Sequence, residues 1–327
     1  MMVELPSRES RVMIEASGLR RTYKTRGKSI EAVRGIDLRV ASGEIVGFLG
    51  PNGAGKTTTL KMLCTLLDPT GGSATVAGSD LRKDAVGVRR KIGYVSQAGS
   101  TSSEARVGEE IVSHARLYGI DKAVSTERGK ALLAALDLGD VWERACGSLS
   151  GGQRRRLDIV MGLIHQPKLV FLDEPSTGLD PQSRANLWTH IRKLRDDLGT
   201  TVFLTTHYMD EADSLSDRIL IIDNGTIVAE GTPAELKKRV SGDAITLTLR
   251  TEADAARAAA IAGMLAGADA PVVEANVVRL HVPEGGSALP VLLKGLVDAS
   301  IEAIGVEVNR PTLDDVFLTL TGRSLRD

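Results

Sequence analysis

The stretch EIVGFLGPNGAGKT, residues 44–57, decides the fold of this chain of 327 residues. It opens with EIVGFLG, a short apolar run that is typical of a β-strand. It continues as GPNGAGKT, which satisfies the pattern G-x-x-x-x-G-K-[ST], and a helical pattern follows with Leu60, Leu63, Cys64 and Leu67 on one face. A strand, a glycine-rich turn and a helix in this order predict a loop that binds the phosphates of a nucleotide.

Each part of this loop has a physical role in nucleotide binding. Glycines let backbone N–H groups approach phosphate oxygens, and the helix N-terminus adds positive potential. Lys56 reaches the β and γ phosphates, and Thr57 can ligate Mg²⁺. The alternative, a glycine-rich turn with an exposed lysine, leaves the flanking strand and helix unexplained. The residues expected to hold the nucleotide are Gly50, Pro51, Asn52, Gly53, Ala54, Gly55, Lys56, Thr57 and Thr58.

Short apolar runs that end in glycine or acidic residues alternate with helical patterns along the first part of the chain. This alternation predicts an α/β fold with a mainly parallel sheet. Residues 218–231 are instead expected to form a hairpin that turns at Asn224-Gly225. After Gln97 the strand signal disappears, which predicts an inserted helical subdomain at about residues 98–165. The clearest strands are expected at residues 44–50, 91–97, 168–174 and 201–207.

A domain boundary is expected near residue 240, which divides the chain into residues 1–240 and 241–327. TPAE (232–235) offers a capping box with Pro233 at the first helical position, and SGD (241–243) is a plausible linker. The remaining pattern predicts a small α+β domain with an alanine-rich helix and a last helix that Thr312 can cap. Its other elements are expected at residues 244–250, 272–282, 287–299 and 304–310, and its last helix carries a buried stripe of Leu313, Val316, Phe317 and Leu320.

Two adjacent carboxylates end the apolar run KLVFLDE, residues 168–174. A nucleotide with bound Mg²⁺ needs a second metal contact and a group that orients water. Neighbouring side chains at a strand end diverge, so Asp173 is assigned to the Mg²⁺ shell and Glu174 to the attacking water as general base. Two solvated acids at a strand end are the alternative, which the phosphate-binding loop disfavours.

Three further polar residues lie at strand ends or in the loop after the acids: Gln97, His207 and Asp180. Ligands of open α/β sheets bind outside the carboxyl ends of the strands, so these residues are placed to sense a γ-phosphate. A single histidine or glutamine at a strand end is more often structural. The prediction therefore depends on their occurring together with the phosphate-binding loop.

The stretch LSGGQRRRLDIV, residues 149–160, resembles a phosphate-binding loop but lacks its lysine. A helix is expected here, because Leu157, Val160, Met161 and Ile164 recur on one face. Three arginines, at positions 154–156, crowd its first turn, where each cation opposes the helix dipole by about 0.3–1 kcal/mol. They are either a solvated face or partners of acidic neighbours, and the sequence leaves this open.

These motifs, in this order, resemble those of the ATP-binding subunits of ABC transporters over about residues 12–236. The resemblance implies a P-loop NTPase (RecA-like) core with an antiparallel β subdomain. It identifies GPNGAGKT as Walker A, LSGGQ as the signature, LVFLDE as Walker B and STGLD, which contains Asp180, as the D-loop. It also implies that Gln97 is the Q-loop residue and a metal ligand, that His207 is the switch histidine, and that Tyr23 stacks on adenine. For Tyr23, a packed edge residue is the alternative.

The resemblance also answers why the signature has no lysine. In ABC ATPases two nucleotide-binding domains face each other head to tail, and the signature of one closes over the γ-phosphate bound by the other. Ser150, Gly151, Gly152 and Gln153 would then act in trans through hydroxyl and backbone donors and the helix dipole. Each chain would therefore supply two incomplete halves of different sites.

The stretch LTTHYMDEADSLSDRI and the ending RPTLDDVFLTLTGR resemble the daunorubicin-resistance type of drug-exporter ATPase. This implies hydrolysis of ATP with Mg²⁺ to power export of drugs, antibiotics or lipid-like compounds through ATP-driven dimer closure. The implied partners are a second nucleotide-binding domain, as a homodimer, and an ABC-2 type membrane permease, at the cytoplasmic face of the cell membrane. The segment AGSTSSEARVGEEI after Gln97 departs from related subunits, so contacts with the membrane partner are not transferred. The last domain either braces the dimer or regulates it.

Composition limits the other function classes. Lys and Arg number 41 and Asp and Glu 42, so a net charge of -1 provides no global attraction to nucleic acid, which is not an expected partner. Cys64 and Cys146 have no metal-ligand spacing and are expected to be reduced, packed thiols of a cytosolic protein. No apolar run reaches about 18 residues and none follows the N-terminal charges, so neither secretion nor membrane spanning is expected.

Three rival functions remain to be weighed. An ABC-type ATPase that acts on nucleic acid or ribosomes usually has two ATPase halves, a long coiled coil or zinc-ligating cysteines, none of which occurs here. A P-loop kinase of small molecules explains GPNGAGKT but not LSGGQ or His207. An inactive regulatory module is disfavoured because Lys56, Asp173, Glu174 and His207 are all present.

Overall fold

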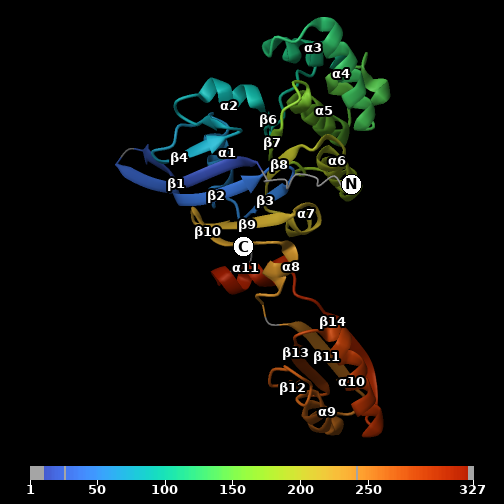
Figure 1. The fold of residues 1–327 in the computed structure, drawn as a ribbon. Coiled ribbons are helices and arrows are strands. Elements are labelled where there is room, and N and C mark those ends of the chain that lie inside the picture. Colours follow the sequence, from blue (N-terminus) through green and yellow to red (C-terminus); the bar gives the residue numbers. More distant parts are fainter. Residues whose placement is uncertain (1–10, 26, 241, 323–327) are drawn as a thin grey trace, which may run out of the picture. The chain divides into compact units, whose positions relative to one another are not determined.

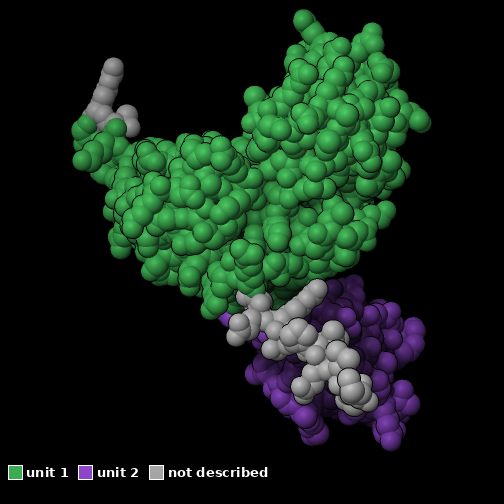
Figure 2. Space-filling view, turned by 45° about the horizontal axis from the view of Figure 1, so that its top comes forward, with its two compact units in different colours: residues 1–233, 326 green, residues 234–325, 327 purple. Residues whose placement is uncertain are grey.

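The computed structural model describes residues 11–25, 27–240 and 242–322, which form two compact units. The first unit ends at Pro233 and the second begins at Ala234 (Figure 2). The short helix α8 (Pro233–Lys237) begins at the predicted proline. The linker expected at residues 241–243 includes Ser241, which lies outside the described residues.

An antiparallel sheet forms one part of the first unit, as the resemblance implied. Its two long strands pair with each other along most of their length, and the shorter strands continue the sheet on one side (Figure 1). Buried side chains on its inner face, among them Ile14 and Leu19, belong to the same apolar core as the helix that follows the phosphate-binding loop. In spatial order the strands are β2 (Lys28–Ala41), β1 (Val12–Thr25), β4 (Gly71–Val76) and β5 (Ser79–Asp80).

A second, six-stranded sheet carries the predicted strand ends and confirms the mainly parallel arrangement. Only its edge strand β10 pairs antiparallel, through the hairpin predicted at Asn224-Gly225. Both turn residues have positive φ, 47° and 80°, as a two-residue hairpin turn of type I′ requires. In spatial order the strands are β10 (Thr226–Gly231), β9 (Arg218–Asp223), β3 (Ile45–Leu49), β8 (Thr201–Thr206), β7 (Leu169–Asp173) and β6 (Ile92–Val95).

The central strands of this sheet are buried on both faces, which explains their unbroken apolar sequence. Successive side chains point to opposite faces of a strand. In β7, Phe171 faces the core under the antiparallel sheet, where its ring centroid lies 5.7 Å from that of Phe203. Val170 and Leu172 face a second core beneath the helices. The sheet therefore holds the two halves of this unit together.

Helices cover the parallel sheet, and the chain between β6 and β7 is helical as predicted (Figure 1). The strand expected at residues 91–97 is shorter, because α2 extends to Lys91 and the strand ends at Val95. Gln97 therefore lies in the turn beyond the strand. The helices of this unit are α1 (Lys56–Leu63), α2 (Ala85–Lys91), α3 (Val107–Leu117), α4 (Lys122–Ala135), α5 (Gly151–Leu163), α6 (Pro181–Leu198) and α7 (Met209–Leu215), with 3-10 turns at Gly139–Val141 and Cys146–Ser148.

The second unit is the predicted α+β domain and has the order βαββαβ. Its strands lie in the order β12-β13-β11-β14, all antiparallel, which is the split βαβ arrangement. Apolar residues of this sheet pack with those of α9 and α10 in a core of their own. The elements are β11 (Asp243–Leu249), α9 (Ala255–Ala262), β12 (Val272–Glu274), β13 (Val277–Val282), α10 (Gly285–Asp298) and β14 (Ala303–Asn309), with a 3-10 turn at Glu252–Asp254.

The last helix, α11 (Leu313–Thr321), begins with the capping box predicted at Thr312. Leu313, Val316 and Phe317 are buried as expected. Leu320 is 39% exposed, so the prediction of a four-residue buried stripe is wrong at this position. The stripe ends one turn early because Leu320 lies in the final turn, just before the helix stops at Gly322.

Two further expectations concern the whole chain. Cys64 and Cys146 are free and buried, as predicted for packed thiols. Burial raises the pKa of both thiols, which keeps them protonated. Within the described residues, every helix is too short or too polar to cross a bilayer.

Candidate site for nucleotide binding and hydrolysis

The glycine-rich loop leaves the carboxyl end of β3 and enters α1 at Lys56. Gly53 and Gly55 have φ of 82° and 106°, a region that side chains other than glycine rarely adopt. A Cβ on Gly50 would lie 2.3 Å from the carbonyl oxygen of Ile222, and one on Gly55 would lie 2.5 Å from that of Ala32. The loop can therefore be built only with glycine at these positions.

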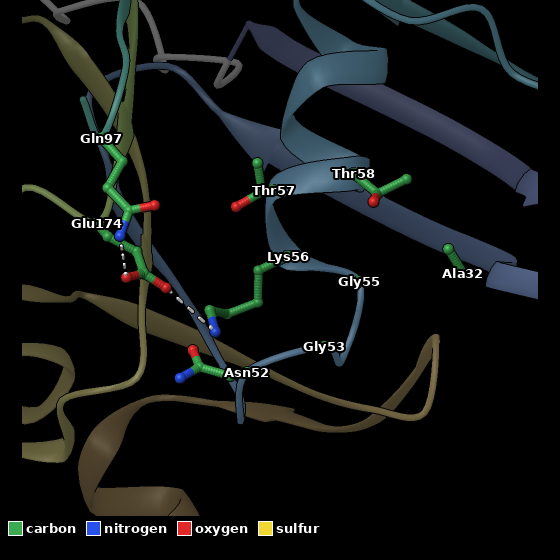
Figure 3. A pocket seen from close by; sticks show the side chains of 9 residues that line it. All are labelled: Ala32, Asn52, Gly53, Gly55, Lys56, Thr57, Thr58, Gln97 and Glu174. Atoms are coloured by element: carbon green, nitrogen blue, oxygen red, sulfur yellow. Dashed lines mark hydrogen bonds and ion pairs between the residues drawn. The ribbon is translucent and has the colours of Figure 1, made fainter. Parts of the chain in front are cut away.

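This loop bounds a pocket of about 220 Å³ on the carboxyl side of the parallel strands (Figure 3). The backbone of the loop forms one wall, and Gln97 and Glu174 face it from the other side. Of the predicted loop residues, Gly50, Pro51 and Ala54 do not line the pocket. The lining residues are Ala32, Asn52, Gly53, Gly55, Lys56, Thr57, Thr58, Gln97 and Glu174.

Lys56 is only 4% exposed and projects into this pocket. Its Nζ donates to the carbonyl oxygens of Gly50 at 2.8 Å and Pro51 at 3.0 Å, and it lies 3.4 Å from Oε1 of Glu174. Burial lowers the pKa of Lys56, and the carboxylate of Glu174 opposes that change. The ammonium is thus held between the loop and a carboxylate, where a phosphate group can compete for it.

Oxygen atoms that can ligate a cation lie in and next to the pocket, on Thr57, Gln97 and Asp173. Thr57 Oγ1 donates to Asp173 Oδ1 at 3.0 Å, and Thr205 Oγ1 donates to the same oxygen at 2.8 Å. Gln97 uses its Nε2 as a donor, which leaves its carbonyl oxygen available. Hydroxyl, carboxylate and amide oxygens are the ligands that Mg²⁺ prefers, so these residues fit the ion.

Glu174 is the centre of the site, with an exposed fraction of only 7%. Its Oε2 accepts hydrogen bonds from Gln97 Nε2 and Thr177 Oγ1, each at 3.1 Å, and lies 3.2 Å from His207 Nδ1. The φ of Glu174 is 45°, a left-handed conformation that costs a residue other than glycine about 1–2 kcal/mol. A strained backbone persists only where the surrounding contacts outweigh its energetic cost, and such strained residues cluster at functional sites.

Tyr23 and Asp180 are among the predicted site residues that do not line this pocket. Tyr23 lies on β1 and is half-buried, with the guanidinium of Arg21 4.8 Å from its ring centre, and it does not line the pocket. Asp180 is exposed and caps α6, where it accepts hydrogen bonds from the backbone N of Ser183 at 2.9 Å and from its hydroxyl at 2.6 Å. Neither Tyr23 nor Asp180 is among the residues that line this pocket of a single chain.

The signature also lies outside the pocket of its own chain. Ser150 Oγ accepts from the backbone N of Gln153 at 3.2 Å, and the Gln153 side chain accepts from the backbone N of Ser150 at 3.0 Å. This reciprocal capping box fixes the start of α5. Gly151 is exposed, and a Cβ on Gly152 would lie 2.9 Å from the hydroxyl of Ser183.

A buried polar cluster behind the site was missed at the sequence level. Glu211 on α7 is fully buried and accepts hydrogen bonds from the hydroxyl of Ser176 and, at 3.1 Å, from the indole of Trp188. Through the hydrogen bond from Ser176, Glu211 connects the loop after Glu174 to α7, the helix after His207. Glu211 is the second acid of MDEADSL (209–215), and only its place on the inner side of the helix distinguishes it from its exposed neighbours.

Burial raises the pKa of Glu211 above its ordinary value of 4.5. A carboxyl whose pKa is raised on folding contributes stability at low pH, and this contribution is lost as the pH rises through the folded pKa. Gln at this position keeps an oxygen that accepts from Ser176 and Trp188 but cannot ionise. We expect the free energy of unfolding of the unmodified chain to fall relative to Glu211→Gln as the pH rises above 4.5. Denaturant unfolding of both proteins across the pH range measures this, and parallel pH profiles would contradict it.

Comparison with known proteins places this site in a family. The family model described as "ABC transporter" matches residues 33–177, and the model described as "ATP-binding protein DrrA1-3-like, C-terminal domain" matches residues 231–321. The daunorubicin resistance ATP-binding protein DrrA3 of Streptomyces coeruleorubidus is 42% identical over 299 residues, which cover 90% of this chain and 93% of that protein. The daunorubicin/doxorubicin resistance ATP-binding protein DrrA of Streptomyces peucetius is 41% identical over 319 residues, 96% of this chain and 94% of that protein.

A solved structure agrees with the fold of the first unit. It is an ATP-binding cassette in a dimeric, post-hydrolysis state bound to ADP and Pi, with a TM-score of 0.62 and 25% sequence identity. The match covers 67% of this chain and 98% of that chain. Together with the two family models, it confirms the resemblance drawn from the motifs. The chain therefore belongs to the ATP-binding subunits of ABC transporters, the ATPases that power membrane transport, and within them to the daunorubicin-resistance type of exporter ATPase.

Proposed function

We propose that the pocket between the glycine-rich loop and Glu174 hydrolyses ATP only after the signature of a second copy of this chain has closed over it. The observation that carries this proposal is the separation of the two motifs within one chain. The loop and the carboxylate face each other across the pocket, whereas Ser150 and the start of α5 are not among the residues that line it. The N-terminus of a helix favours a bound anion, and the proposed anion here is the γ-phosphate in the pocket of the second copy.

In this proposal each residue of the pocket has one role. Lys56 moves from Glu174 to the β and γ phosphates of ATP, which carry more negative charge than one carboxylate. Glu174 takes a proton from a water molecule whose oxygen attacks the γ-phosphorus, and the bond to the leaving ADP oxygen breaks. Gln97 and His207 hold the carboxylate in place. Bound Mg²⁺, held by Thr57, Asp173 and Gln97, would neutralise charge on the phosphates.

The second half of the site comes from the partner copy. Ser150, Gly151, Gly152 and Gln153 supply hydroxyl and backbone donors to the γ-phosphate, and the α5 dipole adds positive potential. A homodimer of this kind holds two equivalent sites, related by a two-fold axis. The dimeric state named for the solved cassette, which is bound to ADP and Pi, supports this arrangement. Asp180 and Tyr23, which stay outside the pocket of one chain, remain proposed nucleotide contacts.

The work performed is proposed to be export of a drug, an antibiotic or a lipid-like compound. Supporting this, two relatives that align over nine-tenths or more of their length are named for daunorubicin or doxorubicin resistance. The membrane-spanning partner would be an ABC-2 type permease at the cytoplasmic face of the cell membrane. The surface that contacts this permease would lie on the helical subdomain after Gln97. There the presence or absence of the γ-phosphate would change the local geometry.

Purification of the full chain from solubilised membranes tests the transport role. Mass spectrometry of the co-purified proteins is expected to identify one integral membrane protein with about six hydrophobic spans of roughly 20 residues each. Recovery of ribosomal proteins or nucleic acid in its place, at stoichiometric amounts, would support the non-transport alternative and overturn the proposal.

A further inference from the structure

The three arginines after the signature, Arg154 to Arg156, are not equivalent in the structure. Arg154 and Arg156 are partly exposed, and each donates to carbonyl oxygens of its own surroundings, such as those of Cys146 and Leu136. Arg155 is 7% exposed and points into the protein. Its nearest carboxylate, that of Asp158, lies 4.0 Å from Nη1, so acidic neighbours alone do not explain its position.

The Arg155 guanidinium holds the main chain on both sides of the proposed general base. Its Nη2 donates to the carbonyl oxygen of Asp173 at 2.9 Å, and its Nε donates to that of Pro175 at 2.9 Å. These are the residues immediately before and after Glu174. Two charge-assisted hydrogen bonds, one to the peptide group before Glu174 and one to the peptide group after Pro175, therefore hold the chain around the left-handed Glu174, whose φ is 45°.

The same guanidinium reaches the segment that carries Gln97. Nη1 of Arg155 donates to the carbonyl oxygen of Ser96 at 2.6 Å. One turn further along α5, Asp158 Oδ1 accepts from the backbone N of Ser100 at 3.1 Å. Residues on both sides of Gln97 are thus attached to a single face of the signature helix.

These contacts suit an arginine at position 155. A guanidinium presents N–H donors in a rigid planar fork, so one side chain can serve three carbonyl oxygens that lie in different directions. A lysine retains the charge but directs its donors from a single flexible ammonium. Gln97 and Glu174, which are 77 residues apart in sequence, bond to each other at 3.1 Å only if both main-chain segments are held.

We propose that Arg155 is the positioning residue that sets Gln97 and Glu174 in their catalytic geometry and couples this pair to the signature helix of the same chain. The inference rests on the proposed function, in which that signature belongs to the other nucleotide site of the dimer. Closure of the signature over one ATP is then transmitted through Arg155 to the catalytic pair of the second site.

Arg155→Lys is expected to lower kcat of the full chain for ATP about 10- to 100-fold, because a displacement of about 1 Å at a reacting group costs on that order. KM and nucleotide affinity are expected to stay within about threefold, since the hydrogen bonds of Arg155 among the described residues go to Ser96, Asp173 and Pro175 and not to the glycine-rich loop. Arg154→Lys is the matched control, with the same change at the neighbouring position, and is expected to retain wild-type kcat. Arg155→Gln serves as a second variant.

Mixed dimers locate the effect. In a reference dimer of one wild-type chain and one Glu174→Gln chain, the competent site combines Glu174 of the first with the signature of the second. Placing Arg155→Lys in the chain that keeps Glu174 is expected to lower turnover at least about tenfold relative to the reference. Placing it in the Glu174→Gln chain, whose signature serves that site, is expected to lower turnover less than about threefold.

Each remaining outcome has a defined meaning. An equal loss in both mixed dimers, a loss that follows the signature chain, or wild-type kcat in Arg155→Lys would overturn the inference while the reference dimer still turns over. Loss of nucleotide binding together with kcat in both variants would show that Arg155 maintains the fold and not the catalytic pair, which also overturns it. A reference dimer without turnover contradicts the proposed function itself.

Discussion

Glu174→Gln is expected to slow ATP hydrolysis about 10²- to 10⁴-fold and to leave ATP binding intact, because a general base contributes on that order. The amide has nearly the shape of the carboxylate, so it can keep the hydrogen bond with Gln97. It cannot accept the proton of the attacking water. Removing the charge also releases Lys56, which lies 3.4 Å from the carboxylate, to bind phosphate.

The measurements are phosphate release under saturating ATP, equilibrium binding of ATP, and molecular mass in the presence of ATP and Mg²⁺. Because the proposed dimer closes over ATP and this variant leaves the ATP intact, the variant is expected to accumulate as an ATP-bound dimer. Glu15→Gln, the same change at an exposed position of β1, is the control and is expected to hydrolyse ATP at the normal rate. A wild-type rate in Glu174→Gln would remove the residue from its proposed role.

Two inactive variants are expected to restore activity to each other when mixed. Lys56→Ala disables the glycine-rich loop, and Ser150→Arg blocks the signature, so each homodimer contains two defective sites. A mixed dimer combines the intact loop of one chain with the intact signature of the other, and the second site carries both defects. With random pairing, about half of the dimers are mixed, and each mixed dimer has one competent site out of two. About a quarter of the normal activity is therefore expected.

A second mixture provides the control for this experiment. Lys56→Ala and Glu174→Gln affect the same half of the site, since both side chains line one pocket. Every dimer formed from these two variants has two defective sites, and no recovery is expected. Absence of recovery in the first mixture, with mixed dimers demonstrated, or equal recovery in both mixtures would contradict assembly of the site from two chains.

Much of the candidate site could be proposed from the sequence, because its motifs need particular backbone conformations as well as particular functional groups. GPNGAGKT contains glycines at positions where a side chain would clash with the main chain. The apolar run before it and the helical pattern after it identify the flanking strand and helix. Asp173 and Glu174 follow a run that is apolar because both of its faces are buried. The meeting of Gln97, Glu174 and His207 also followed from one rule, since parallel strands present their carboxyl ends at one edge.

The errors and omissions lie where a residue's role depends on distant neighbours. The helical period predicted burial of Leu320, but the period carries no information on where the covering surface ends. Three consecutive arginines look alike in sequence. Only the tertiary structure shows that the middle one is buried and donates hydrogen bonds to the main chain at the end of β7 and after β6. Glu211 could not be distinguished from neighbouring acids before its helix was placed against Trp188.

By itself, then, the sequence determined the glycine-rich loop, the order of the motifs around it, the α/β core and the separate α+β domain. Spacing and periodicity can be read in short stretches of chain. Only the tertiary structure decided which side chains share an environment: the placement of Glu174 among four partners, the burial of Arg155 and the separation of the signature from its own pocket. Such contacts join residues far apart in the chain, and their geometry exists only once the sheet and its helices have packed.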